Sequence, residues 1–184
     1  MSAAEQDAVD RIVAQWARER PELDSSPMEV VGRIHRVADL LEVGLRPPFA
    51  AAGLGNGDFD VLASLRRAGA PYRLSATELT ATMMVTSGAV TKRVDRLAAA
   101  GLVTREVSEH DARGRLIELT PQGLEVVDRV VVAHWANEER LISALDADER
   151  SALVAALRKL LLSLEDPDAP ARENFSPRGG TIPA

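Results

Sequence analysis

Residues 75–119 constrain the fold more than any other part of the chain, because helix start and stop signals follow one another closely there. Ser75 and Glu78 are the two ends of a capping box, which predicts the start of a short helix. The dipeptide Thr86-Ser87 can cap a second helix a few residues later, and Gly101 is placed to end it. Two short helices joined by so short a linker are typical of a helix-turn-helix.

Two short strands are predicted directly after this pair of helices. Residues 102–107 and 115–119 have the length and apolar content of strands, and the polar loop 108–114 separates them. A hairpin in this position would be the wing of a winged helix-turn-helix.

Three amphipathic helices are predicted before this unit. Val9, Ile12, Val13 and Trp16 form the stripe of a first helix that ends before Pro21. A second helix is predicted from Ser26 as N-cap, with Pro27 in its first turn and Glu29 completing a capping box, to an end near residues 46–48. After a glycine-rich turn at 53–57, Phe59, Leu62 and Leu65 mark a third helix that Gly69 closes.

Two more helices are predicted after the hairpin. Thr120 and Pro121 give an N-cap and a first-turn proline for a long helix, and Asp146 with Glu149 starts the last one. The last helix carries a leucine stripe, which consists of Leu153, Leu157, Leu160, Leu161 and Leu164. This is more apolar surface than a peripheral helix of a small domain needs, so we expect a second copy of the chain to cover it.

The expected fold is therefore mainly α-helical with a small β-hairpin: a winged helix-turn-helix with N- and C-terminal dimerisation helices. The N-terminal helices occupy residues 1–46 and contribute to dimerisation and to a possible ligand lobe. The DNA-binding domain is expected at 55–120 and the C-terminal dimerisation helices at 121–165. Residues 166–184 are rich in proline, glycine and charge and are expected to be a flexible tail.

The charge of the chain is unevenly distributed. The net charge is −6, yet residues 87–115 contain six basic and four acidic residues, a local charge of +2. An acidic body with one basic segment favours docking on DNA in a single orientation, although a mixed solvated surface explains the charge equally well.

Composition excludes several classes of function. The chain has no cysteine, so disulfides, zinc-cysteine sites and thiol chemistry are excluded, and the three histidines show no metal-ligand spacing. We expect no metal and no cofactor. No apolar run is long enough to span a membrane and no signal peptide is recognised, so a cytoplasmic protein without membrane contact is expected.

Four segments together resemble the MarR family (multiple-antibiotic-resistance regulators). They are residues 87–97 (SGAVTKRVDRL), 101–103 (GLV), 111–115 (DARGR) and 119–123 (LTPQG), and the order of predicted elements from about Met28 to Leu164 is also that of the family. One departure is Ala112, at a wing position where family members often have arginine.

The resemblance implies a ligand-responsive transcription regulator, expected to be a repressor, that binds double-stranded DNA as a homodimer at a near-palindromic operator. The implied DNA-binding residues are Thr86, Ser87, Gly88, Thr91, Lys92, Arg96, Arg113 and Arg115. The N-terminal end of the second short helix suits a phosphate because its backbone N–H groups are unpaired, although an ordinary N-cap explains the same residues. Arg115 can instead pair locally with Asp111.

The first helix adds a narrower resemblance to the urate-responsive branch of the family. The positions that match the ligand site of that branch are Trp16, Asp60, Arg93 and Arg105, which implies a small anionic or aromatic effector such as urate. A plain salt bridge between Asp60 and an arginine, with Trp16 in the dimer core, explains the same residues equally well.

Two other classes of function were weighed. A helical protein-interaction module without DNA binding would lack salt-dependent retention on duplex DNA. An enzyme is disfavoured because the sequence has no phosphate-binding glycine loop, nucleophile elbow or His-Glu metal helix. The group of residues that most resembles an acid/base cluster consists of Asp58, Asp60 and Arg66.

Overall fold

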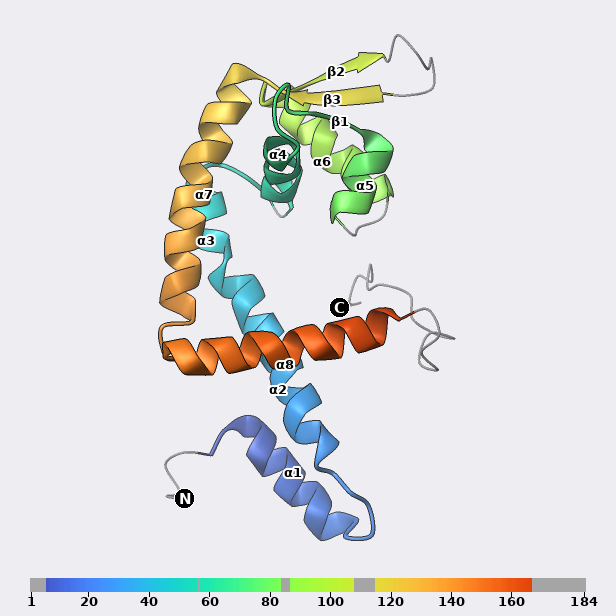
Figure 1. Ribbon diagram of the computed structural model, residues 1–184, viewed down its shortest axis with the longest axis vertical. Coiled ribbons are helices and arrows are strands. Elements are labelled where there is room, and N and C mark those ends of the chain that lie inside the picture. Colours follow the sequence, from blue (N-terminus) through green and yellow to red (C-terminus); the bar gives the residue numbers. More distant parts are fainter. Residues whose placement is uncertain (1–5, 56, 84–86, 108–114, 167–184) are drawn as a thin grey trace. The chain divides into compact units, whose positions relative to one another are not determined.

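A computed structural model describes residues 6–55, 57–83, 87–107 and 115–166 of the chain, and these form a mainly helical fold with one small antiparallel sheet (Figure 1). The helices are α1 (Ala8–Glu19), α2 (Pro27–Gly44), α3 (Arg46–Ala51), α4 (Asp58–Arg67), α5 (Ala76–Met83), α6 (Ser87–Ala99), α7 (Pro121–Leu141) and α8 (Ala147–Glu165). The strands are β1 (Arg73–Ser75), β2 (Val103–Val107) and β3 (Arg115–Leu119). The chain divides between Arg46 and Pro47 into two compact units.

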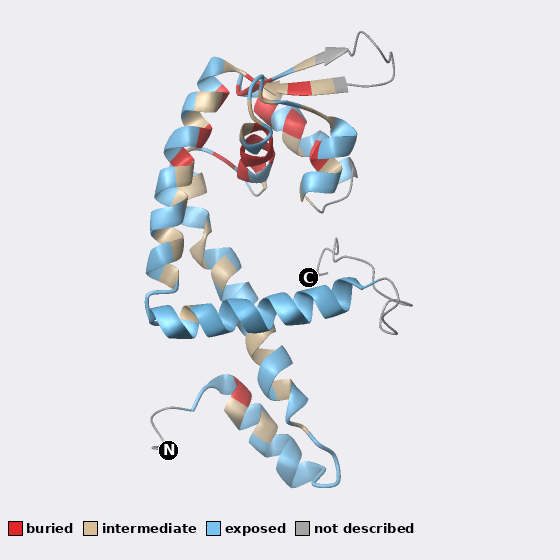
Figure 2. Cartoon of the chain, viewed as in Figure 1, coloured by how far each residue is buried: buried red, intermediate tan, exposed pale blue. Residues whose placement is uncertain are grey.

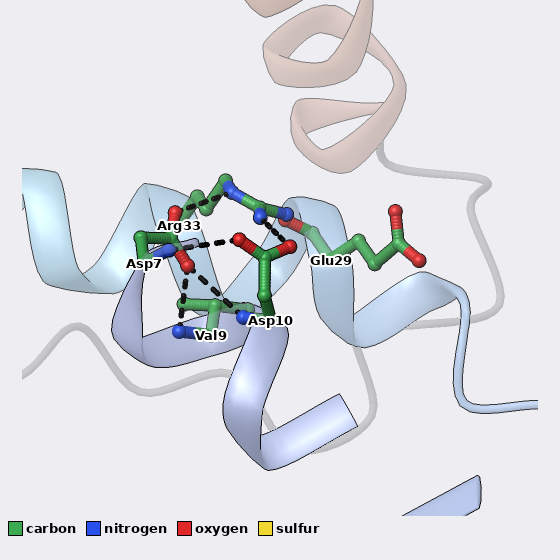
Figure 3. A network of polar contacts seen from close by, with 5 residues as sticks. All are labelled: Asp7, Val9, Asp10, Glu29 and Arg33. Atoms are coloured by element: carbon green, nitrogen blue, oxygen red, sulfur yellow. Dashed lines mark hydrogen bonds and ion pairs between the residues drawn. The ribbon is translucent and has the colours of Figure 1, made fainter. Parts of the chain in front are cut away.

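The first unit is a pair of helices held together mainly by polar contacts. Asp7 caps α1 by accepting from the backbone N–H groups of Val9 and Asp10, and the Asp10 side chain completes the capping box. Arg33 on α2 reaches across to both carboxylates, with Nε 2.8 Å from Asp7 Oδ2 (Figure 3). Val9 is the one buried residue of α1 and packs on Gly32, where a Cβ atom would lie only 3.2 Å from Val9 Cγ1.

The predicted capping of α2 is wrong in its chemistry. Ser26 has helical backbone angles and its side chain makes no capping hydrogen bond. Asp24 is the acceptor instead, for both the backbone N–H and the hydroxyl of Ser26. The proline pair after Arg46 also does not end helical structure there, since α2 stops at Gly44 and α3 follows as a separate six-residue helix. Prolines are tolerated in the first turn of α3, where their missing N–H groups would be unpaired anyway.

The second unit has one hydrophobic core, to which α4, α6, the sheet and the first half of α7 all contribute (Figure 2). Val61, Leu62 and Leu65 of α4 are fully buried at its centre. The buried side chains around them are Leu79, Val90, Val94, Leu97, Val103, Ile117, Leu119, Val127 and Val130. This core fixes how α6 lies against α4.

The sheet has three strands in the order β1-β3-β2. The predicted hairpin of β2 and β3 is therefore confirmed, and the sheet contains one further strand that was not predicted. β2 and β3 pair antiparallel with Arg105 opposite Ile117, and Leu74 of β1 lies opposite Ile117 from the other side. Strand β1 was not predicted, because three residues are too few to show alternation. Ser75 is also both the last residue of β1 and the cap of α5, where it exchanges hydrogen bonds with Glu78.

The predicted starts of α7 and α8 are confirmed by their hydrogen bonds, whereas Thr86, a predicted cap of α6, lies outside the described residues. The Thr120 hydroxyl accepts from the backbone N–H of Gly123 at the start of α7. Asp146 and Glu149 form a complete capping box at the start of α8. Gly101 follows α6 with φ of +71°, a backbone angle that glycine adopts more readily than other residues.

Within the described residues α8 has no buried residue, and its whole surface is exposed or nearly so (Figure 2). The helix therefore contributes no side chain to the core of its own protomer. The described part of the chain contains no helix with the length and hydropathy to cross a membrane.

Candidate nucleic-acid interface and ligand residues

Helix α6 is amphipathic, with its two faces divided between the core and solvent. Val90, Val94 and Leu97 are buried, and the opposite face exposes Gly88, Thr91 and Lys92. A Cβ atom added at Gly88 would meet no other atom within 4 Å, so the backbone is open on that side. The first turns of α6 therefore present accessible backbone, a hydroxyl and an ammonium group on one surface.

Seven of the eight predicted DNA-binding residues fall into three groups. Gly88, Thr91 and Lys92 share the exposed face of α6, and Lys92 is in none of the ion pairs seen among the described residues. Ser87 is the first residue of α6 and Arg115 the first of β3. Thr86 and Arg113 lie outside the described residues. Arg96 is the eighth, and its surroundings differ from those of the others.

The Arg96 guanidinium is bound within the protein. Its Nη2 lies 2.6 Å from Oδ1 of Asp58, the first residue of α4, whose side chain is only 7% exposed. Asp58 Oδ2 also accepts from the backbone N–H of Gly55 at 2.8 Å. The hydrogen bond that Arg96 donates to Asp58 raises the pKa of Arg96 above its ordinary value. Sequence reasoning placed Arg96 on the outer face of α6 and missed this contact with α4.

Arg93 is held near the same end of α4 by a looser contact. Its Nη1 lies 3.5 Å from Asp60 Oδ2, and that nitrogen is buried without a hydrogen-bond partner. The guanidinium lies over Gly57, which has φ of +76°, and a Cβ atom there would be 2.1 Å from Arg93 Cζ. Gly57 therefore does more than form part of the predicted turn, because the absence of a side chain there also leaves room for the Arg93 guanidinium.

Arg105 lies between strand β2 and helix α6. It makes an ion pair with Asp95 at 2.6 Å and donates to the backbone carbonyl of Thr91 at 3.3 Å, so it joins β2 to α6. Of the four predicted ligand residues, the structure pairs Asp60 with Arg93 and gives Arg105 another carboxylate. Trp16 belongs to the first unit, where its side chain is 50% exposed on α1.

The residues named as a possible acid/base cluster do not form one. Asp58 pairs with Arg96, Asp60 with Arg93, and Arg66 with Asp128 of α7. Each carboxylate thus has its own cation. Among the residues that the structure describes, no group of three or more His, Cys, Asp or Glu side chains is placed to hold a metal ion.

An aromatic cluster between α3, α4 and α7 was not predicted. Phe49 and Phe59 are stacked with centroids 4.8 Å apart, and the His134 ring lies 5.0 Å from each. His134 Nε2 is 3.1 Å from Glu138, and its Nδ1 is buried without a partner. A pocket of about 640 Å³ opens beside this cluster, with Arg66, Val131 and Trp135 in its wall. No periodicity connects three rings so far apart in sequence, so only the fold reveals the cluster.

Comparison with known proteins gives consistent results. Residues 52–114 match the sequence profile of a family described as the MarR family. The HTH-type transcriptional regulator PecS of Dickeya dadantii is 39% identical over 152 residues, which cover 83% of this chain and 92% of PecS.

Two solved structures with similar folds contain DNA. The MarR family regulator Sco3205 of Streptomyces coelicolor, in complex with DNA, is 26% identical with a TM-score of 0.70, and the match covers 80% of this chain and 94% of that one. A variant of MarR from Escherichia coli, complexed with operator DNA, is 28% identical with a TM-score of 0.65, and the match covers 79% and 97%.

Proposed function

Because this chain belongs to the MarR family and is a DNA-binding transcription regulator, we propose that it acts as a homodimeric repressor at a near-palindromic operator and responds to a small anionic ligand. The exposed face of α6 carries the DNA part of this proposal. Gly88 leaves the backbone open near the helix N-terminus, where N–H groups and the positive end of the helix dipole attract phosphate. Thr91 and Lys92 on the same face can reach base edges and a second phosphate.

Uncovered apolar helix faces support the homodimer. The large apolar side chains exposed in the isolated protomer include Val30, Val37, Leu40, Val132, Trp135, Leu153, Leu157, Leu160, Leu161 and Leu164. Large apolar side chains exposed along a helix mark an interaction site in a soluble protein, and α2, α7 and α8 each carry at least two. With two copies related by a two-fold axis, the two α6 helices would read half-sites about 10 base pairs apart.

Duplex DNA from the region upstream of the chain's own coding sequence provides the test of DNA binding. Salt titrations should show affinity falling steeply with ionic strength, and Lys92→Gln should reduce the slope of log K against log salt by about 1. Lys159→Gln on α8 removes the same charge away from α6 and is the matched control. If Lys92→Gln and Lys159→Gln both behave like the parent, α6 does not face DNA as proposed.

The ligand part of the proposal rests on Arg93. Its buried Nη1 has no hydrogen-bond partner, and its ion pair with Asp60 spans 3.5 Å, so an anion that reaches this nitrogen would make a better contact. Asp60 would then accept a ring N–H and Arg105 would supply a second cation, which suits an anionic purine such as urate. Since Arg93 belongs to α6, a ligand that pulls on it would disturb the DNA-reading helix.

Titration with urate, xanthine and small aromatic carboxylates, followed by tryptophan fluorescence and release of operator DNA, tests this assignment. A 100-fold loss of DNA affinity would correspond to about 2.7 kcal/mol of coupling, within the usual allosteric range. Asp60→Asn, Arg93→Ala and Arg105→Ala should each reduce the response. If urate does not change DNA binding by the parent protein, the purine assignment is wrong. If all three variants respond to the ligand as the parent does, the assigned site is wrong.

A further inference from the structure

Two arginine–aspartate pairs attach the recognition helix α6 to the first turn of α4. Arg93 and Arg96 lie one helical turn apart on α6, and their partners Asp60 and Asp58 are both in the first turn of α4. The pairs thus join the same two helices at adjacent points. They differ in burial, in geometry and in what else their carboxylates bind.

The Asp58–Arg96 ion pair has the features of a stable contact. The carboxylate is nearly fully buried, and besides the 2.6 Å contact with Arg96 it accepts the backbone N–H of Gly55. A Cβ atom at position 55 would lie 2.9 Å from Asp58 Oδ2, so the loop closes tightly around this oxygen. Removing Arg96, whose side chain is 52% exposed, would leave the buried Asp58 carboxylate unpaired, and such losses are large compared with those at surface pairs.

The Asp60–Arg93 ion pair has the features of a weaker contact that can be broken. Asp60 is 58% exposed, so water can replace the arginine at little cost, and the 3.5 Å contact is too long for a strong hydrogen bond. The cation rests over Gly57, where the backbone carries no Cβ atom, and its buried Nη1 has no hydrogen-bond partner among the described residues. Asp60 therefore holds this guanidinium by one long contact.

We propose that the Asp58–Arg96 pair is a fixed pivot for α6 and that Arg96 acts on DNA binding through Asp58, without itself touching DNA. Arg93 is the releasable contact beside that pivot. Arg96 is therefore a positioning residue, which departs from its predicted DNA contact. The part of this proposal that concerns DNA rests on the proposed function, whereas the difference between the two pairs does not.

Two double-mutant cycles on the full chain test the difference in unfolding equilibrium, at one fixed protomer concentration because a dimer's stability depends on it. One combines Asp58→Asn with Arg96→Gln, and the matched cycle combines Asp60→Asn with Arg93→Gln. We expect coupling of about tenfold or more in the unfolding constant for the first pair and about threefold or less for the second. Equal coupling in the two cycles would overturn the pivot.

Salt titrations on a mixed-sequence duplex test the role of Arg96. Asp58→Asn, Arg96→Gln and their double variant should weaken binding by the same factor with the same salt slope, because all three remove one pivot. An arginine that touches phosphate would behave differently: Arg96→Gln alone would lower the slope by about 1, and that result would refute the positioning role. If the parent binds no duplex, the proposed function fails, and the stability cycles still decide the pivot.

Discussion

The same substitution, glycine to alanine, should have opposite effects in the first turns of α6 and α7. At Gly123, the third residue of α7, a Cβ atom would lie 1.9 Å from the backbone carbonyl oxygen of Leu102. Backbone cannot rotate away as a side chain can, so α7 and the start of β2 must separate by more than about 1 Å to restore ordinary contact. At Gly88, the second residue of α6, the added atom would meet nothing.

The expected loss at Gly123 follows from the contacts at that point. Separation would break the hydrogen bond from Thr120 N–H to Leu102 C=O, worth about 1 kcal/mol, and overpack the buried Leu102 at a cost of about 1–3 kcal/mol. Replacing glycine by alanine in a helix returns up to about 1 kcal/mol. The net loss for Gly123→Ala is about 1–3 kcal/mol in the free energy of unfolding, which lowers Tm by roughly 2–12 °C for a chain of this size.

Thermal unfolding followed by circular dichroism, at one protomer concentration, measures both variants. Gly88→Ala should unfold at the parent's temperature or up to about 4 °C above it. Since Gly88 lies on the proposed DNA surface, the same variant should nevertheless bind DNA more weakly. A Gly123→Ala protein as stable as Gly88→Ala would show that the contact between α7 and Leu102 is not as tight as described.

Three further predictions follow from other contacts. Gly57→Ala should displace Arg93 and weaken the ligand response, whereas Gly53→Ala, with the same kind of positive φ but nothing within 4 Å, should cost similar stability and leave the response intact. Arg33→Ala should remove both ion pairs between α1 and α2 and leave the packing of Val9 on Gly32, so that thermal unfolding followed by circular dichroism shows a less stable protein while DNA binding without ligand persists. Leu157→Ala with Leu161→Ala should give monomer or aggregate in sedimentation, because both leucines are exposed to solvent in the described part of the protomer; a stable micromolar dimer would contradict this.

The sequence predicted most helix boundaries because short-range chemistry sets them. Thr120 caps α7 through a residue three positions away, and such spacings can be read along the chain. The capping prediction failed at Ser26 because Asp24, two residues earlier, accepts from both the backbone N–H and the hydroxyl of Ser26, and the hydroxyl makes no hydrogen bond to the helix. Strand β1 was missed because it exists only through pairing with β3, which lies more than forty residues further along.

The site was harder to predict because its pairs are distant in sequence. Arg96 and Asp58 are 38 residues apart, and nothing in the spacing of α6 distinguishes a cation that faces DNA from one that reaches α4. The helical pattern assigned both Arg93 and Arg96 correctly to faces away from the core. It could not show that the first turn of α4 offers two carboxylates to those faces.

These ion pairs change how the positive net charge of residues 87–115 is interpreted. Residues 87–115 have a net charge of +2, which suggested a basic surface, yet Arg93, Arg96 and Arg105 each lie against a carboxylate. An arginine already paired releases few counterions from DNA, because the phosphate must displace a carboxylate first. Three of the six basic residues in this segment therefore act on the geometry of α6 more than on its charge. DNA affinity should then depend on two α6 helices held at the correct spacing. A contact that shifts one of these helices, such as that of Arg93, should change DNA affinity strongly without changing any group that faces DNA.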